Sequence, residues 1–275
     1  MKISKTLYIR YLFTLLLPLS GLLQACDMIE YHPYDLDIDG ETEVNARNIQ
    51  RIETALDGKK EFSFAVISET QRWYDETEDA VADMNEKGGI DFVVHTGDLS
   101  DFGMKLEFEK QRDILNGLSV PYVCLLGNHD CLATGKEVFN RIFGEENFSF
   151  TAGDVLFICL NTNALEFDYS DAIPDFSFLE KLLKNLSPDI RRTIVAMHAG
   201  PYSEQFNNNV ARVFQLYLRQ FPGLQFCVYG HGHSIQVNDF FDDGILYYEC
   251  TCAKKRAYLR FTLKENEYLY EVVNY

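Results

Sequence analysis

Basic residues are scarce in this chain. Its 25 lysines and arginines stand against 42 aspartates and glutamates, which gives a formal net charge of −17 at pH 7. A surface of this charge repels phosphate backbones, so no nucleic acid is expected as a stable partner. A small phosphate-bearing substrate would need local positive charge instead, and bound metal ions are the obvious source of it.

The chain also lacks internal repeats and low-complexity segments. Its 275 residues are 47% hydrophobic, which is enough to build the core of one domain of ordinary size. We divide the chain into residues 1–25, a signal peptide; residues 26–60, an acidic tether with a short helix; and residues 61–275, the folded domain.

The first 25 residues have the pattern of an export signal. Three basic residues precede the apolar residues 11–23, and a small residue, Ala25, stands before Cys26. The apolar run is too short and too early to be read as a membrane span. The ending Leu23-Gln24-Ala25-Cys26 resembles a bacterial lipobox, which predicts lipidation of Cys26 and a lipid-anchored protein of the cell envelope. The alternative is a plain cleaved signal with an incidental cysteine.

Six further cysteines need an interpretation. Cys124, Cys159 and Cys227 lie in apolar, strand-like runs, where a buried thiol serves as a small hydrophobic side chain. An oxidising envelope permits disulfides, but their connectivity cannot be deduced from sequence. The pair Cys250-x-Cys252 lacks a second pair, so it makes a weak zinc motif.

From residue 61 onward, apolar strands alternate with amphipathic helices, which predicts an α/β layered domain. The expected strands are 62–67, 91–95, 121–126, 155–160, 193–197 and 225–229. The expected helices are 76–86, 105–115, 136–143, 176–186 and 210–220. Four strand-like segments follow at 234–241, 245–252, 256–263 and 267–273, and we expect them to form an antiparallel meander that closes a second sheet.

Five of the strands run into polar clusters. The clusters are Glu69-x-Gln71, Gly97-Asp98-Leu99-Ser100-Asp101, Gly127-Asn128-His129-Asp130, His198-Ala199-Gly200-Pro201 and Gly230-His231-Gly232-His233. Ligands bind beyond the carboxyl ends of strands in open α/β sheets, so these clusters are expected to converge. Four of the six histidines fall within them.

The order of these clusters resembles the calcineurin-like metallophosphoesterase family, over roughly residues 61–235. The resemblance implies a four-layer α/β/β/α sandwich of two mixed sheets flanked by helices. It also implies hydrolysis of a small-molecule phosphate ester by a metal-bridging hydroxide at a dinuclear site. The two divalent metal ions could be Mn, Fe, Zn, Mg or Ca; the sequence identifies neither the metals nor the substrate, nor does it give the oligomeric state.

The resemblance also assigns the metal ligands. Asp98 would bridge the two ions, and Asn128, His198 and His231 would complete one site. The other site would take Asp98, His233 and the first cluster, where the family usually has Asp-x-His.

This chain departs from the family pattern in that first cluster, which reads Glu69-x-Gln71. Glu69 keeps the carboxylate but reaches further by about one carbon–carbon bond, roughly 1.5 Å. Gln71 replaces an imidazole with a neutral amide oxygen, so this site should bind more weakly and favour manganese, magnesium or calcium over zinc. The alternative is an empty first site, in a degenerate domain with one metal or none that acts as an envelope binding protein.

Two further residues receive catalytic roles from the resemblance. His129 would protonate the leaving oxygen, and Asp101 would orient its ring. The alternative for Asp101 is a loop cap. We expect His95, at the end of its strand, to be a supporting or core histidine rather than a ligand.

The residues after the first cluster are candidates for substrate binding. Arg72 could meet a phosphate, and Trp73, the only tryptophan, could form one wall of the substrate mouth. Simple packing of the aromatic side chain is the alternative. The polar loop Tyr202–Asn209 could shape the rim of the site or be an ordinary surface loop.

Overall fold

The computed structural model describes residues 35–275, and one compact unit spans Leu36–Tyr275. The signal peptide and the lipidation site Cys26 lie outside the described residues. Within them, no helix combines the length and the apolar character that a membrane span needs.

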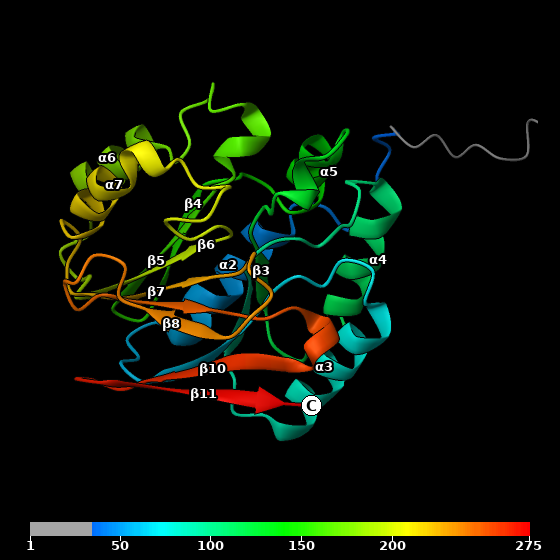
Figure 1. The fold of residues 1–275 in the computed structure, drawn as a ribbon. Coiled ribbons are helices and arrows are strands. Elements are labelled where there is room, and N and C mark those ends of the chain that lie inside the picture. The colour runs from blue at the N-terminus through cyan, green and yellow to red at the C-terminus, as the bar shows by residue number, and fades with distance from the viewer. Residues whose placement is uncertain (1–34) are drawn as a thin grey trace, which may run out of the picture. The chain divides into compact units, whose positions relative to one another are not determined.

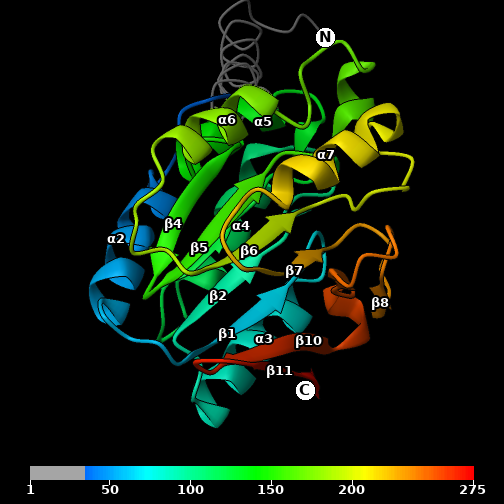
Figure 2. The ribbon, with the colours of Figure 1, turned by 90° about the vertical axis from the view of Figure 1, so that its left-hand side faces the viewer.

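Two sheets form the centre of this unit, as Figures 1 and 2 show. The first has the strand order β11-β10-β1-β2-β3. Its strands are β1 (Phe62–Ile67), β2 (Phe92–His95), β3 (Tyr122–Cys124), β10 (Ala257–Leu263) and β11 (Tyr268–Asn274). Strands β1, β2 and β3 are parallel, whereas β10 runs antiparallel to both β1 and β11.

The second sheet has the order β4-β5-β6-β7-β9-β8. Its strands are β4 (Phe148–Ala152), β5 (Val155–Leu160), β6 (Arg192–Met197), β7 (Leu224–Tyr229), β8 (Gln236–Asn238) and β9 (Leu246–Glu249). Strands β5, β6, β7 and β9 are parallel, and the edge strands β4 and β8 are antiparallel to their neighbours.

Helices cover the outer faces of both sheets, so the predicted four-layer α/β/β/α fold is confirmed. The helices α3 (Tyr74–Lys87), α4 (Lys105–Leu115) and α5 (Gly135–Ile142) pack on the first sheet, and α6 (Phe176–Lys184) and α7 (Ala211–Leu218) on the second. Local sequence sets the ends of these helices. The Asp175 carboxylate, for example, accepts the main-chain N–H groups of Ser177 and Phe178 at the start of α6.

The apolar core between the sheets follows from the period of two along each strand. Phe64 and Val66 of β1 point into this core, whereas Ala65 and Ile67 pack under the helices. Because both faces of β1 are covered, the strand is apolar at nearly every position, as parallel strands in layered α/β proteins are.

Helix α2 (Val44–Leu56) belongs to this core rather than to a separate tether. Its residues Ile52 and Leu56 are buried between the sheets, and its side chains Asn45 and Asn48 donate hydrogen bonds to main-chain oxygens of β3. The compact unit therefore begins at Leu36 and not at residue 61.

The expected antiparallel meander in the tail is wrong. Strands β8 and β9 extend the second sheet, with β9 parallel to β7, whereas β10 and β11 join the first sheet beside β1. Burial on both faces explains the position of β9. Its Tyr247 packs under the helices and its Tyr248 in the core between the sheets, so the strand needs a covered place beside β7.

Candidate metal centre

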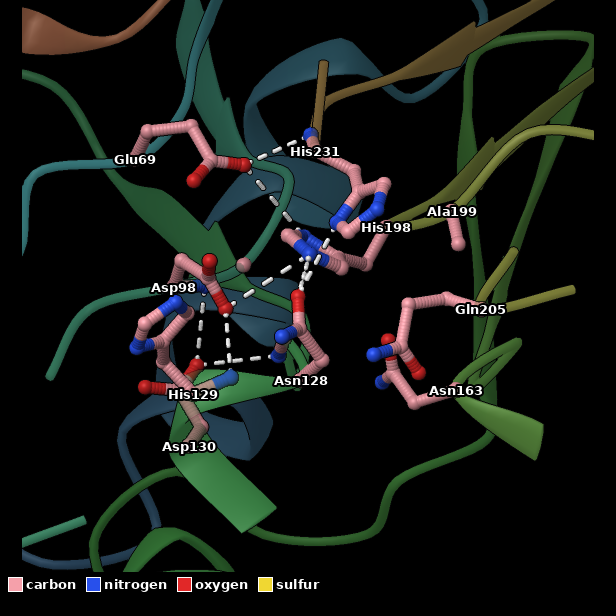
Figure 3. A network of polar contacts seen from close by, with 12 residues as sticks. Glu69, Asp98, Asn128, His129, Asp130, Asn163, His198, Ala199, Gln205 and His231 are labelled. Carbon is pink, nitrogen blue, oxygen red and sulfur yellow. Dashed lines mark hydrogen bonds and ion pairs between the residues drawn. The ribbon is translucent and has the colours of Figure 1, made fainter. Parts of the chain in front are cut away.

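The predicted ligands come from both sheets and meet at one edge of the sandwich. Figure 3 shows Glu69, Asp98, Asn128, His198 and His231 of this set. All of them follow the carboxyl ends of parallel strands. Glu69 and Gln71 follow β1, Asp98 follows β2, Asn128 follows β3, His198 follows β6, and His231 and His233 follow β7. Hydrogen bonds and close polar contacts connect all seven residues in one network.

The backbone is strained at most of these positions. Glu69, Gln71, Asp98, His231 and His233 all have positive φ, between 34° and 70°. Non-glycine residues rarely adopt this region, and residues that do so gather at functional sites because the surrounding structure holds them there. Five of the twelve described non-glycine residues with positive φ thus belong to the candidate ligands, which supports this edge as the functional site.

Two buried carboxylates form the acidic part of the site. Glu69 and Asp98 are almost inaccessible to solvent, and no Lys or Arg among the described residues forms an ion pair with either. Burial raises the pKa of Glu69 to about 7. Burial, together with the negative charge of Glu69, raises the pKa of Asp98 well above its usual range. A cation would remove the cost of holding both groups charged.

Ligand atoms of Glu69, Asp98 and His198 all lie within 4.8 Å of one another. The Nδ1 of His198 lies 2.9 Å from the main-chain oxygen of Thr96, which can only accept, so this nitrogen carries the ring proton. Burial lowers the pKa of His198 well below its usual range, so the ring is neutral and its Nε2 is bare.

That bare nitrogen faces other acceptors. His198 Nε2 lies 2.9 Å from Asn128 Oδ1 and 3.5 Å from Asp98 Oδ1. His231 Nδ1 lies 3.0 Å from the same Asn128 oxygen, and His231 Nε2 lies 3.0 Å from Glu204 Oε1. The lone pairs of His198 Nε2 and Asn128 Oδ1 thus face each other with no hydrogen between them. This arrangement fits a divalent cation, with nitrogen and oxygen ligands that suit Mn, Fe or Zn.

The other half of the site differs in character. His233 Nε2 lies 2.9 Å from Glu69 Oε2, and the His233 side chain is 40% exposed. The Gln71 amide faces Asp98 through its nitrogen, which lies 3.4 Å from Oδ2. Gln71 therefore acts as a hydrogen-bond donor to the carboxylate in this structure, so the amide must turn before its oxygen can serve as a ligand.

Glycine permits the close approach of the loops. A Cβ atom at Gly127 would lie 2.1 Å from the main-chain nitrogen of Asp98 and 2.2 Å from its Oδ1. No side chain fits in this space, so only glycine allows the loop after β3 to touch the loop after β2.

The structure places His129 beside the acidic pair. Its main-chain N–H donates to Asp98 Oδ1 at 2.9 Å. Its ring Nδ1 lies 2.9 Å from Asp101, but the partner is the main-chain oxygen of Asp101 and not the carboxylate that the sequence analysis expected. The carboxylate of Asp101 instead pairs with Arg72 Nη2 at 2.6 Å.

The other two candidates after β1 lie on the solvent side of the site. The side chain of Arg72 is 62% exposed although it holds the buried Asp101 carboxylate. The Trp73 ring meets the His233 ring edge to face, with 6.0 Å between centroids. Both residues thus contact members of the site, and Arg72 is a cation beside it.

Sequence reasoning missed two residues that organise the site. Asp130 is fully buried, and its carboxylate accepts the main-chain N–H groups of Asp98, Leu99, Ser100 and Gly127. The sequence did carry a signal for Asp130, because this acidic residue lies within a polar cluster at the end of a strand. For Glu204, which contacts His231, no residue pattern in its polar loop distinguishes it from its neighbours.

His95 has the supporting role that was expected. It is fully buried, and its ring contacts the Thr70 hydroxyl through Nε2 at 2.9 Å and the Gly97 main-chain N–H through Nδ1 at 3.1 Å. Gly97 N–H can only donate, so Nδ1 is the acceptor and Nε2 carries the proton. His95 thereby ties the loop after β1 to the loop after β2.

Fold and site together define a class of layered α/β proteins that hold cations at the carboxyl ends of their strands. The family model described as Calcineurin-like phosphoesterase matches residues 62–234, and the chain therefore belongs to the calcineurin-like phosphoesterase family. The description of the family is that of a group of phosphoesterases.

Two curated relatives are similar over part of their length. A 3′,5′-cyclic-nucleotide phosphodiesterase of Nostoc sp. is 28% identical over 153 residues, covering 53% of this chain and 56% of that protein. The DNA double-strand break repair protein Mre11 of Sulfolobus acidocaldarius is 28% identical over 170 residues, covering 56% of this chain and 41% of that protein. The matched region thus spans about half the length of these relatives or less.

Solved structures share the fold. A dimetal phosphatase from Danio rerio superposes with a TM-score of 0.61 at 13% identity, over 78% of this chain and 96% of that one. A purple acid phosphatase from yellow lupin gives a TM-score of 0.60 at 13% identity, over 78% of this chain and 51% of that one. At this identity the likeness shows the common architecture.

Proposed function

We propose that the protein hydrolyses a phosphate ester at a dinuclear metal site. Asp98, Asn128, His198 and His231 would hold one cation. Asp98 would also hold the second, with Glu69, Gln71 and His233. The observation that carries the proposal is the meeting of His198 Nε2 and Asn128 Oδ1, two acceptors with no hydrogen between them, 3.5 Å from Asp98 Oδ1 on the His198 side.

Two divalent cations, when bound, would activate water and offset the charge that builds on the phosphate oxygens. The chain's own groups would do the rest. The hydrogen bond from Nδ1 to the Asp101 main chain fixes the ring of His129, so a protonated ring has its Nε2–H free to give a proton to the leaving oxygen. Arg72 supplies an exposed guanidinium beside the site, which suits a phosphate oxygen.

A pair of variants tests this site. Asp98→Ala and His129→Ala should each lower the metal-supplemented hydrolysis of generic phosphate monoesters and diesters at least about 100-fold. They should differ in metal content, because Asp98 would be a ligand and His129 would not. Elemental analysis should therefore find metal in His129→Ala and little in Asp98→Ala. Activity that survives both substitutions would rule out this assignment.

The orientation of Gln71 favours a second candidate function, a domain with one tightly held cation or none that binds a ligand without turnover. Restoring the common motif by Glu69→Asp with Gln71→His separates the two. A large gain in activity and a second equivalent of metal in this variant alone would show that the natural site is crippled. Two equivalents in the natural protein, with no gain from the substitutions, would show that its site is tuned rather than degenerate.

We also propose that lipidation of Cys26 anchors the protein at the cell envelope, on the strength of the Leu-x-Ala-Cys sequence. The variant Cys26→Ser should move the protein from the membrane fraction to the soluble fraction and abolish labelling by a fatty-acid analogue. A labelled Cys26→Ser protein, or an unlabelled natural one, would contradict the anchor.

A further inference from the structure

A cavity of about 340 Å³ adjoins the candidate metal centre. Its lining includes Gly230, His231 and Gly232 of the loop that carries the ligands after β7, together with residues of the loop after β6 and of β8 and β9. A cavity of this size suits a small molecule, and His231, a candidate ligand, is part of its wall. The organic part of a phosphate ester held at the centre can therefore occupy it.

The charge of this cavity is one-sided. Glu204 and Glu249 both line it, and none of the described residues in its wall is Lys or Arg. Glu249 is only 4% exposed, and none of the ion pairs among residues 35–275 includes it. Its oxygens accept hydrogen bonds from neutral groups, namely Tyr229 Oη at 3.2 Å, Ser234 Oγ at 3.0 Å and the main-chain N–H of Ser234 at 3.3 Å. The wall thus holds a buried carboxylate without a cationic partner.

Aromatic rings complete the wall. The Phe240 ring contacts the rings of Tyr202 and Tyr229, with centroid distances of 5.8 Å and 6.1 Å. Ring faces and carboxylates both attract cations, whereas they repel or fail to bind anions. Ser203 also lines the cavity, and its buried hydroxyl has no hydrogen-bond partner among the described residues.

We propose that this cavity selects phosphate esters whose organic group carries a positive charge, such as the phosphate of an amino alcohol. The inference rests on the proposed phosphate-ester hydrolysis and adds the charge of the substrate to it. Glu249 is the specificity-determining residue: its carboxylate faces the ammonium group while the phosphate occupies the metal centre. Esters with a second anionic group are rejected by the same wall.

Three esters on one two-carbon frame test the charge alone. They are 2-aminoethyl phosphate, 2-hydroxyethyl phosphate and 2-phosphoglycolate, each assayed with the manganese-loaded protein as the monoester and as its methyl diester. The expected order of kcat/KM is cationic, then neutral, then anionic, with at least a tenfold step between the first two. Binding of 2-aminoethylphosphonate and 2-hydroxyethylphosphonate, followed by calorimetry, should give Kd values in the same order.

Variants assign the preference to the cavity. Glu249→Gln keeps the shape and removes the charge, and it should reduce the ratio of kcat/KM for the cationic ester to kcat/KM for the neutral ester about tenfold. Glu109→Gln, in an equally buried glutamate on α4, is the matched control and should leave the preference unchanged. Asn238→Asp adds a carboxylate to the same wall and should increase the preference, which keeps the test open if Glu249→Gln fails to fold.

The outcomes separate the two proposals. Equal hydrolysis of the three esters and equal Kd values for the two phosphonates would overturn the charge selection and leave the phosphoesterase function intact. A preference that persists in Glu249→Gln would overturn the role of this residue. If the manganese-loaded protein neither hydrolyses any ester nor binds either phosphonate, the proposed function itself fails.

Discussion

Asp130 holds the two loops of the first sheet together, and its replacement by Asn is the most informative perturbation of the site. One carboxylate oxygen accepts the N–H groups of Asp98, Leu99 and Gly127 at 2.9 to 3.2 Å. The other accepts both the main-chain N–H and the hydroxyl of Ser100 at 2.8 Å. All of these donors except the hydroxyl are main-chain groups that water does not reach.

The loss of stability in Asp130→Asn depends on which of these hydrogen bonds the asparagine amide can still make. If its oxygen keeps the three-bond position, its NH2 group faces Ser100, whose hydroxyl can turn and accept but whose main-chain N–H is orphaned. An orphaned buried donor costs about 1–3 kcal/mol, and the three remaining bonds lose the added strength of a charged acceptor. Relief from burying a charge offsets part of this loss. We expect Asp130→Asn to lower the free energy of unfolding by about 2–4 kcal/mol.

Urea unfolding in the presence of a chelator, followed by circular dichroism, measures this loss without the contribution of bound metal. Asp91→Asn is the matched control, because the half-buried Asp91 carboxylate accepts a single main-chain N–H, that of Ser63, at 2.9 Å. The control should lose less than about 1 kcal/mol. If Asp130→Asn loses no more than the control, the hydrogen bonds to Asp130 do not hold the loops and the reasoning is refuted.

Three further predictions concern single contacts. Burial lowers the pKa of His95 to about 3, so the stability that its neutral ring contributes is present above pH 6.5 and is lost as the pH falls toward 3. The difference in unfolding free energy between the natural protein and His95→Asn should therefore fall by about 1.4 kcal/mol per pH unit between pH 6 and 4. A difference that stays constant with pH would contradict a neutral ring. Gly127→Ala should abolish metal binding in calorimetry because its Cβ would collide with Asp98, and normal affinity would show that the loops can separate at little cost. Glu204→Gln should weaken Mn²⁺ binding about tenfold. This is the smallest loss of affinity usual for a residue that hydrogen-bonds to a metal ligand, and we expect it because Glu204 is exposed. Unchanged affinity would mean that Glu204 does not orient His231.

Hydrophobic periodicity was enough to predict most of the strands and helices. The strands at 62–67 and 155–160 and the helix at 105–115 have the predicted bounds. Strand β4 was missed although residues 148–152 alternate apolar and polar side chains before a Gly-Asp turn. The division of the tail between two sheets could not be predicted, because periodicity shows which residues are buried but not which sheet edge a strand joins.

The candidate site was also predictable only in part from the sequence. Local motifs placed Asp98, Asn128 and the histidines at strand ends, and the parallel order of the strands then brings them to one edge. The contact of His129 with the main chain of Asp101 was beyond reach, because motifs identify side chains and not the carbonyl groups that a loop turns inward. Glu204 reaches His231 across the junction of two loops, a proximity that no local pattern records.

The division of the ligands between the two sheets has a consequence for how the protein loses activity. The loops after β1, β2 and β3 carry one share of the donors, and the loops after β6 and β7 carry the other. A slight sliding of one sheet over the other would disperse the donors while each sheet kept its own ladder of hydrogen bonds. Gentle heating should therefore inactivate the protein before its far-ultraviolet circular dichroism changes. Bound cations should delay both events because they link ligands from the two sheets.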